Sequence, residues 1–559
     1  MRTHFAASLA LLAVVIPGAL HAQWSSQQVA LLRPDPFVLG VGDDFGSALD
    51  LDGPTLVVGA HWHDPVGGGQ NDGGAWVWRL NAGVWSQEAA LAPAPGSIGR
   101  FGLAVAVDGD RIAVGAPFEW VNSISGAGAV HVFTRVGGVW TLEARLTAPS
   151  PTVAAHFGQA LALEGDVLAI GAPRDDQPGF TDCGAAYVFR RINGAWSQEA
   201  RLTSSSPGAF DYLGASIALS GARVAAGAAL DDVAGAVNRG SVVLFESTGG
   251  AWSESALFEP ADGAAGDEYG TSVAIDGDTL VVGAPFHDAL GTNVGAAYVY
   301  RDSSGVWTLE AKLSDIGATF VDNFGAALDL EGDRLAVGLP YNAVPGVTSG
   351  AVQFFTRSGS VWTGHFDMIG SETDGLDYLG SAVALSGSLV AAGAPGAEPV
   401  AGANSYGEAY VFEITAPPTI ESYCTAKTNS LGCAPQMSWS GVPSTLNPSA
   451  FDLRCEQVLN AKWGLLFYGF APTAAPFDGG WLCAAPPLRR TALQYSGGSS
   501  APVNDCSGSY SFDMNAWIQS GVDAQLAVGV DVWTQYWMRD PQSPSSTGLS
   551  DSIHFEIAP

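Results

Sequence analysis

A glycine-centred pattern recurs seven times along the chain. Each copy has a Gly-Ala or Gly-Leu step after a short apolar run, and an aromatic-Gly element lies ahead of it, as in Phe101-Gly102 or Tyr378-Leu379-Gly380. Such a period is typical of proteins whose units bury their faces against identical neighbours. The repeat glycines follow one another every 55 or 56 residues, at Gly59, Gly115, Gly171, Gly227, Gly283, Gly338 and Gly393.

Each repeat contains four short strand-like segments. In the third repeat they are 159–163, 167–170, 185–189 and 196–202, all rich in β-branched, aromatic or small apolar residues and bounded by Gly, Asp or Asn. Four antiparallel strands form one propeller blade. The sequence therefore predicts an all-β fold with a seven-bladed β-propeller over residues 23–415.

The seventh repeat lacks a fourth strand after residues 410–414. A matching segment stands at the other end of the array, where Trp24–Leu32 resembles Trp85–Leu91. We expect this N-terminal strand to complete the last blade, because a blade without it would leave a bare strand edge.

With its Phe/Tyr-Gly pairs and its Gly-Ala-Pro steps at Gly115, Gly171, Gly283 and Gly393, the chain resembles the FG-GAP repeat family, known from integrin α-subunits and exported bacterial proteins. The resemblance covers about residues 24–415 and implies a seven-bladed propeller used in recognition or adhesion. The family's calcium loops read Asp-x-Asp-x-Asp-Gly between the first two strands. Here those positions carry only minimal turns such as Asp108-Gly109-Asp110, so the family's calcium sites do not carry over.

Residues 1–22 have a short basic start, an apolar core and a small-residue cleavage site, which together predict a secretory signal peptide. No later stretch is apolar enough for a membrane helix. The net charge is −32. This disfavours nucleic acid and anionic membranes as partners. The predicted signal peptide and the lack of a later membrane helix together predict a location outside the cell or on its surface.

The longest loops follow the second strand and precede the first, so both are expected on one face. Carboxylates recur there, and oxygen-rich loops can bind Ca²⁺, although an Asp in a loop more often bonds backbone N–H groups of its own turn. The candidate calcium ligands after the second strand are Asp64, Asp176, Asp232, Asp288 and Glu398. The segments before the first strand add Asp43, Asp44, Asp211, Asp267, Glu268, Asp322 and Asp377.

His61 and His63 flank Trp62 in the first repeat and precede Asp64. Two His and an Asp can bind zinc, although no fourth ligand is visible and an exposed loop with two His is more often only a loop. Tryptophan also recurs at the start of each predicted outer strand, which favours packing between blades over ligand binding. These residues are Trp24, Trp85, Trp140, Trp196, Trp252, Trp307 and Trp362.

The predicted inner strands are built from small and apolar residues, and only Asp50 and Asp329 add charge to them. Neither a ring of catalytic bases nor a nucleophile elbow, phosphate loop or zinc-protease motif is apparent. We therefore expect a binding protein, not an enzyme, that recognises a protein or glycan partner through its acidic long-loop face. The alternatives are a structural cell-envelope protein without a specific ligand and a propeller hydrolase or lyase.

Residues 416–421 read as a linker, and a cysteine-containing β-rich domain is predicted over 422–559. Its five cysteines indicate disulfides in an exported protein. We expect the pairs Cys424–Cys433 and Cys483–Cys506, with Cys455 and the propeller's Cys183 free or unassigned. Alternating segments such as 525–533 and 552–557 favour a β-sandwich. Surface attachment, secretion and carbohydrate binding all remain open as its role.

Overall fold

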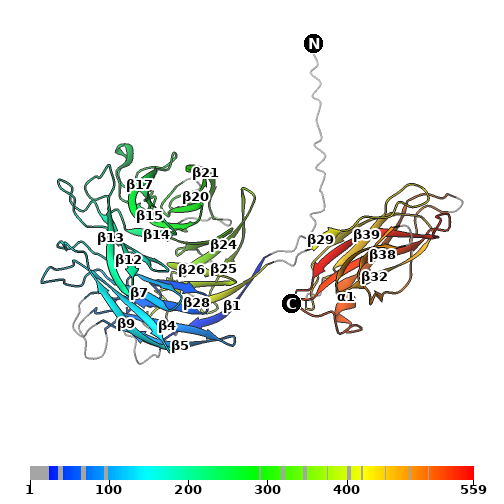
Figure 1. Ribbon diagram of the computed structural model, residues 1–559, viewed down its shortest axis with the longest axis horizontal. Helices are drawn as coiled ribbons and strands as arrows, with labels where there is room; N and C mark the ends of the chain where they lie inside the picture. The colour runs from blue at the N-terminus through cyan, green and yellow to red at the C-terminus, as the bar shows by residue number, and fades with distance from the viewer. Residues whose placement is uncertain are drawn as a thin grey trace, which may run out of the picture. The chain divides into compact units, whose positions relative to one another are not determined.

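The computed structural model describes residues 24–34, 42–64, 71–93, 99–288, 291–315, 321–343, 349–373, 375–398, 405–416, 420–446, 449–477, 480–500 and 503–558. The predicted signal peptide lies outside these residues. The chain forms two compact units, Ser25–Thr415 and the residues from Ala416 onward (Figure 1).

The first unit consists of seven four-stranded antiparallel sheets, one for each repeat. The first four blades are β2 (Ala48–Asp52), β3 (Thr55–Ala60), β4 (Gly74–Asn81) and β5 (Val84–Leu91); β6 (Val105–Asp108), β7 (Arg111–Ala116), β8 (Ala129–Val136) and β9 (Val139–Leu146); β10 (Leu161–Glu164), β11 (Val167–Ala172), β12 (Ala185–Ile192) and β13 (Ala195–Leu202); β14 (Ser216–Ser220), β15 (Arg223–Ala228), β16 (Ser241–Thr248) and β17 (Ala251–Phe258).

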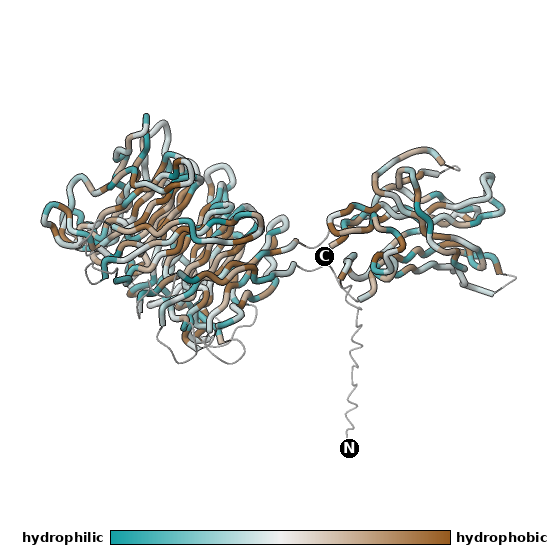
Figure 2. Tube along the Cα trace, turned by 90° about the horizontal axis from the view of Figure 1, so that it is seen from below, coloured by the Kyte–Doolittle hydropathy of each residue, from teal (hydrophilic) through white to brown (hydrophobic). Residues whose placement is uncertain are grey.

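The remaining blades are β18 (Ser272–Asp276), β19 (Thr279–Ala284), β20 (Ala296–Ser303) and β21 (Val306–Leu313); β22 (Ala327–Glu331), β23 (Arg334–Leu339), β24 (Ala351–Ser358) and β25 (Val361–Met368); β26 (Ala382–Ser386), β27 (Leu389–Ala394) and β28 (Glu408–Thr415) with β1 (Ser25–Leu32). The second strand of each blade is almost wholly buried, whereas the fourth alternates between exposed and half-buried residues. In Figure 2 the apolar residues of this unit lie mostly in its interior, and hydrophilic residues are frequent in its outer loops.

The N-terminal strand supplies the missing fourth strand of the last blade. β1 pairs antiparallel with β28, from Ser25 opposite Thr415 to Leu32 opposite Ala409, and the two lie side by side in Figure 1. This confirms the sequence prediction. Blades one and seven are also neighbours, because Leu49 and Trp76 share a buried cluster with Val411.

The repeated glycines allow neighbouring blades to approach closely. Gly115 ends a second strand, and a methyl group on it would overlap the backbone carbonyl oxygen of Gly158 in the next blade. Gly158 itself has φ +95°, which L-residues with a side chain rarely adopt. The same pairing of glycines recurs between all neighbouring blades, including Gly393 with Gly46. The repeat glycine of one blade thus meets the glycine of the aromatic-Gly element of the next blade at their interface.

The short turns between first and second strands are tied together by side chains. Asp108 accepts a hydrogen bond from the backbone N–H of Gly165 in the next blade, and Ser386 accepts one from Gly53, which links blade seven to blade one. The complete series of acceptors is Asp52, Asp108, Glu164, Ser220, Asp276, Glu331 and Ser386. We call this end of the propeller, formed by residues 53–54, 109–110, 165–166, 221–222, 277–278, 332–333 and 387–388, the short-turn face.

The recurring tryptophans lie between blades, as predicted. Trp140 packs against Val57 and Val77 of the preceding blade, and its indole N–H donates to Glu88 at 3.0 Å. Trp362 makes the equivalent bond to Glu310. The Trp ring and its half-buried glutamate acceptor therefore stabilise the interface between outer strands.

The second unit packs a larger sheet against a smaller one. The larger contains β29 (Ile420–Tyr423), β39 (Thr547–Glu556), β38 (Asp531–Arg539), β32 (Trp463–Gly469), β35 (Arg489–Arg490) and β36 (Gln494–Tyr495); the smaller contains β30 (Gln436–Ser440), β31 (Asp452–Val458) and β37 (Gly508–Asp513). A hairpin of β33 (Pro472–Phe477) and β34 (Gly480–Ala484) and the helix α1 (Met514–Gln519) complete it. Leu453, Tyr536 and Phe555 join both sheets in one core, as a β-sandwich requires.

The disulfides join Cys424 to Cys483 and Cys433 to Cys506. The predicted pairing was wrong because it relied on closeness in sequence, whereas the fold brings cysteines together from segments 59 and 73 residues apart. Cys183 and Cys455 are unpaired and buried, as expected. Among the described residues, the structure contains no helix long and apolar enough to span a membrane.

Candidate binding site on the long-loop face

The long loops of all seven blades emerge at the end of the propeller opposite the short turns. Their described parts are residues 61–64, 71–73, 117–128, 173–184, 229–240, 285–288, 291–295, 340–343, 349–350, 395–398 and 405–407. These residues contact the segments that precede the first strands: the backbone N–H of Trp62, for example, donates to the carbonyl of Asp43. We call this end the long-loop face. It carries every candidate ligand residue that the sequence suggested.

The carboxylates after the second strand fix the shape of their own loops. Asp176 accepts a hydrogen bond from the backbone N–H of Asp182 at 2.8 Å, and Asp182 has φ +50°. Asp64, Asp232 and Asp288 accept equivalent bonds from Asn71, Asn238 and Asn293, which also have positive φ. Glu398 is half-exposed. Each carboxylate serves its own blade, and within the described residues no group of three His, Cys, Asp or Glu side chains is arranged to hold a metal ion.

Five carboxylates before the first strand are buried, so they do not contribute to an exposed acidic surface as the sequence suggested: Asp43, Asp211, Asp267, Asp322 and Asp377. They are buried because they bond to groups inside the loops. Asp43 and Asp267 lie 2.7 Å from the Nδ1 atoms of His63 and His287, and Asp211 accepts from the backbone of Gly208. Asp44 and Glu268 are half-buried.

His61 and His63 face different partners. His63 is buried against Trp76 and bonds to Asp43, whereas Nδ1 of His61 lies 2.9 Å from Oγ of Ser47. Burial, together with the nearby charge of Arg100, lowers the pKa of His61 to about 4. The structure therefore gives these two imidazoles separate structural roles and does not bring them together around one point.

Aromatic and cationic side chains stack on one another across blades one to four. The Arg100 guanidinium lies 3.8 Å from the ring centre of Trp62 and 4.1 Å from that of Phe118. The ring of His156 lies 4.3 Å from Phe118. Arg174 then lies over Tyr212 at 5.3 Å. We call these six residues the stacked arc; they alternate between the third position after the repeat glycine and the second position before the glycine of the aromatic-Gly element.

Further aromatic side chains are exposed on this face. Trp120 is 60% exposed and Phe210 is 53% exposed, and Phe180 and Tyr341 are more than one-third exposed. They come from the loops of blades two, three and six and from the segment leading to blade four. Exposed rings among polar loop residues are typical of binding surfaces.

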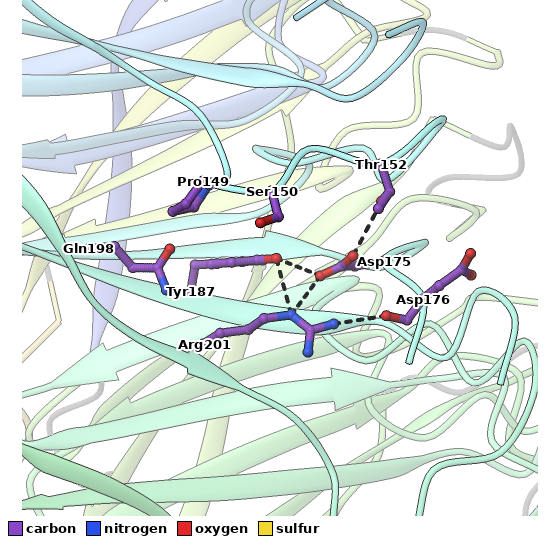
Figure 3. Close-up of a pocket in the computed structure, with 8 residues that line it drawn as sticks. All are labelled: Pro149, Ser150, Thr152, Asp175, Asp176, Tyr187, Gln198 and Arg201. Atoms are coloured by element: carbon purple, nitrogen blue, oxygen red, sulfur yellow. Dashed lines mark hydrogen bonds and ion pairs between the residues drawn. The ribbon is translucent and has the colours of Figure 1, made fainter. Parts of the chain in front are cut away.

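A recess of about 310 Å³ lies in blade three (Figure 3). Arg201 donates to Asp175 at 2.9 Å and to the Tyr187 hydroxyl, and it also reaches the backbone carbonyl of Asp176. Across the recess, the enclosed amide oxygen of Gln198 has no hydrogen-bond partner among the described residues. Burial and the bond to Asp175 raise the pKa of Tyr187, so the phenol stays neutral.

Blades two and five carry related polar groups at the same three positions. In blade two, Glu119 bonds to His131 at 2.8 Å and to Arg145. Although burial opposes it, these two bonds lower the pKa of Glu119. Blade five has His287, Tyr298 and Lys312 instead. The three positions are thus equivalent in these blades, while the side chains that occupy them differ.

The axial channel has a volume of about 450 Å³ and is lined by the first strands of all seven blades. Asp50 and Asp329 lie in it, and each accepts two backbone N–H groups, one of them from the next blade. Burial raises the pKa of Asp50 to about 7, helped by the charge of Asp329, whose own pKa is raised by burial to about 6.

The family assignment rests on the same seven units. The FG-GAP repeat matches residues 39–78, 85–133, 140–189, 196–245, 252–300, 307–355 and 362–412, which together make up more than half of the chain. The chain belongs to the FG-GAP repeat family. Each match runs from the loop or fourth strand of one FG-GAP blade to the third strand of the next. No curated protein matches the chain.

Sequence reasoning missed the stacked arc of this FG-GAP propeller. Its members occupy fixed offsets in each repeat: Trp62 and Phe118 stand three residues after the repeat glycine, and Arg100 and His156 stand just before Phe-Gly. Comparing these two positions across the seven repeats would have shown mostly aromatic or cationic residues in blades one to four, and further aromatic residues at Phe286, Tyr341 and Tyr378. The loop carboxylates form a more obvious pattern in the sequence, because they recur in most blades.

Proposed function

We propose that the protein is an exported binding protein that recognises a protein or glycan partner through its long-loop face. The FG-GAP repeats support a role in recognition or adhesion, and the two disulfides agree with an oxidising compartment outside the cytoplasm. Membership of a fold family does not define a function, so the side chains of the long-loop face must support it.

One observation carries this proposal. At equivalent positions the short-turn face repeats the same hydrogen bond between all blades, whereas the long-loop face varies and displays exposed rings such as Trp120 and Phe210. Binding residues commonly lie on loops that a rigid scaffold holds in place. The residues of such loops can vary because the blades are stable without them.

The experiment uses the mature chain, residues 23–559, and measures its retention of cell-envelope and glycan fractions. The variant Trp120→Ala with Phe210→Ala is expected to lose binding at least tenfold, because exposed aromatic residues dominate interface energies. The matched control is Val136→Ala with Ile192→Ala, two exposed apolar residues at the short hairpin turns. Equal melting temperatures would show that both variants are folded.

Binding that survives the loop variant but falls in the control would place the partner on the other face. No retained ligand from any fraction would instead favour a structural envelope protein. Turnover on polysaccharide or lactone panels would replace the binding proposal with a hydrolase or lyase.

A further inference from the structure

Arg100 and Arg174 differ from most arginines of the propeller. Arg135, Arg191 and Arg357 each pair with a carboxylate of the preceding blade. Within the described part of the chain, by contrast, no carboxylate lies within ion-pair distance of Arg100 or Arg174. Among the described residues Arg79 and Arg239 also lack such a carboxylate, but they donate to Oγ1 of Thr55 and to the carbonyl of Pro260. Arg100 and Arg174 instead stack on aromatic rings.

The surroundings of Arg100 keep its guanidinium fixed and its charge available. The rings of Trp62 and Phe118 stack on it and restrict its rotation, and the group is half-buried. A planar cation held in this way loses less conformational entropy when it binds a carboxylate.

His156 connects the two arginines electrostatically. Burial, then the charges of Arg174 and Arg100, lower the pKa of His156 to about 4, so its ring is neutral near pH 7 and both guanidinium charges act on it. Asp182 is near enough to Arg174 for that charge to favour its ionised form, yet burial still raises the pKa of Asp182. The charges of both arginines thus reach the ring of His156 at the centre of the arc.

We propose that the stacked arc binds the carboxylate groups of an acidic polysaccharide, an inference that rests on the proposed function of the long-loop face. A guanidinium forks onto a carboxylate through two parallel hydrogen bonds. Trp120, Phe180 and Phe210 add exposed rings close to the arc in sequence, and a sugar ring offers an apolar face to such rings.

A polyuronate fits this surface better than an acidic protein. The exposed rings lie among polar turn residues: 122–126 contains Asn, Ser and Gly, and 177–182, which includes Phe180, contains Gln, Gly, Thr and Asp. The buried centre of a protein interface is more apolar than its rim and is depleted of charged residues. Sugar hydroxyl groups, in contrast, can use the N–H and O–H groups of the turns.

The test measures the affinity of the mature chain for polygalacturonate oligosaccharides, for a neutral galactan of equal length and for poly-glutamate. We expect binding of the uronate alone, reduced about tenfold or more in Arg174→Gln and in Arg100→Gln, because each removes a charged hydrogen-bond donor. Arg100→Lys keeps the charge and the fold and should retain part of the affinity. Arg539→Gln, an exposed arginine of the other unit, is the matched control.

Equal binding of poly-glutamate, or a loss in Arg539→Gln as large as in Arg174→Gln, would overturn the inference. If no uronate binds but an envelope ligand still depends on Trp120 and Phe210, the proposed function stands and only the assignment of the ligand fails. If neither ligand binds, both proposals fail.

Discussion

The two faces of the propeller use the same kinds of residue for different ends. On the short-turn face, Asp108 and its equivalents bond to the next blade, and the pattern holds seven times. On the long-loop face, Asp176 and its equivalents bond only within their own loop. The hydrogen bond across each blade interface on the short-turn face recurs with Asp, Glu or Ser as its acceptor, whereas the bond that shapes a single long loop is made by Asp64, Asp176, Asp232 and Asp288. Repetition thus marks structure, and its breakdown marks the candidate binding site.

The largest expected effect comes from a side chain placed between blades. Gly115→Val would overlap the carbonyl of Gly158, so we expect the free energy of unfolding to fall by about 3 kcal/mol or more. Gly109→Asn is the control on the short-turn face. Gly109 has φ +57° and open space around it, and Asn tolerates this conformation, so its cost should stay below about 1 kcal/mol. Chemical denaturation measures both, and equal losses would contradict the close approach of the blades.

The channel between the two faces predicts a pH dependence of stability. The pKa of Asp50 and that of Asp329 are higher in the folded chain, about 7 and about 6, than in the unfolded chain. The folded chain therefore binds these protons more tightly, and their stabilisation is lost as pH rises from about 4 through 7. Between pH 5 and 8, the free energy of unfolding should fall less in the double variant Asp50→Asn with Asp329→Asn than in the unmodified chain. We expect this difference to be on the order of 2 kcal/mol. Parallel pH profiles for the variant and the unmodified chain would argue against the raised pKa values.

A smaller effect separates the two kinds of carboxylate directly. Asp108→Ala leaves the backbone N–H of Gly165 without its acceptor from the neighbouring blade, and it should lower the free energy of unfolding by about 1 kcal/mol. Asp176→Ala should hardly change global unfolding, but it should speed hydrogen exchange at the amide of Asp182. Hydrogen-exchange mass spectrometry distinguishes the two outcomes. A global loss in Asp176→Ala would show that the long loops also stabilise the blades.

The smallest expected effect concerns metal ions. Asp64, Asp176, Asp232 and Asp288 each satisfy a backbone N–H of their own loop, so chelation with EDTA should leave the melting temperature unchanged. A rise in melting temperature on addition of Ca²⁺, abolished by Asp232→Ala, would restore the calcium hypothesis for this face.

Much of the fold could be predicted because seven repeats in register constrain one another. The match of Trp24–Leu32 to Trp85–Leu91 was enough to predict the pairing of β1 with β28. Strand ends were less certain: β10 begins at Leu161, two residues later than expected, because Gln159 closes a turn onto His156.

The candidate site and the second unit were harder to predict from the sequence, because their contacts do not repeat along the chain. The burial of Asp43 and Asp267 depends on His63 and His287 across the loops, and no local pattern reveals such a contact. Similarly, Cys424 joins Cys483 because sheet pairing, not distance along the chain, decides which cysteines meet. The stacked arc was accessible in principle through its fixed offsets, whereas its stacking distances were not.

The pairing of β1 with β28 also sets an order of events during biosynthesis. The strand that leaves the ribosome before all seven repeats finds its partner only when Glu408–Thr415 has followed it. Until then β1 has no partner, and long-range pairing of this kind is slow. An exported chain would therefore reach its final form only after nearly four hundred residues have been delivered. A ribosome or translocation machine that stalls within the seventh repeat would leave an incomplete propeller, open to proteolysis.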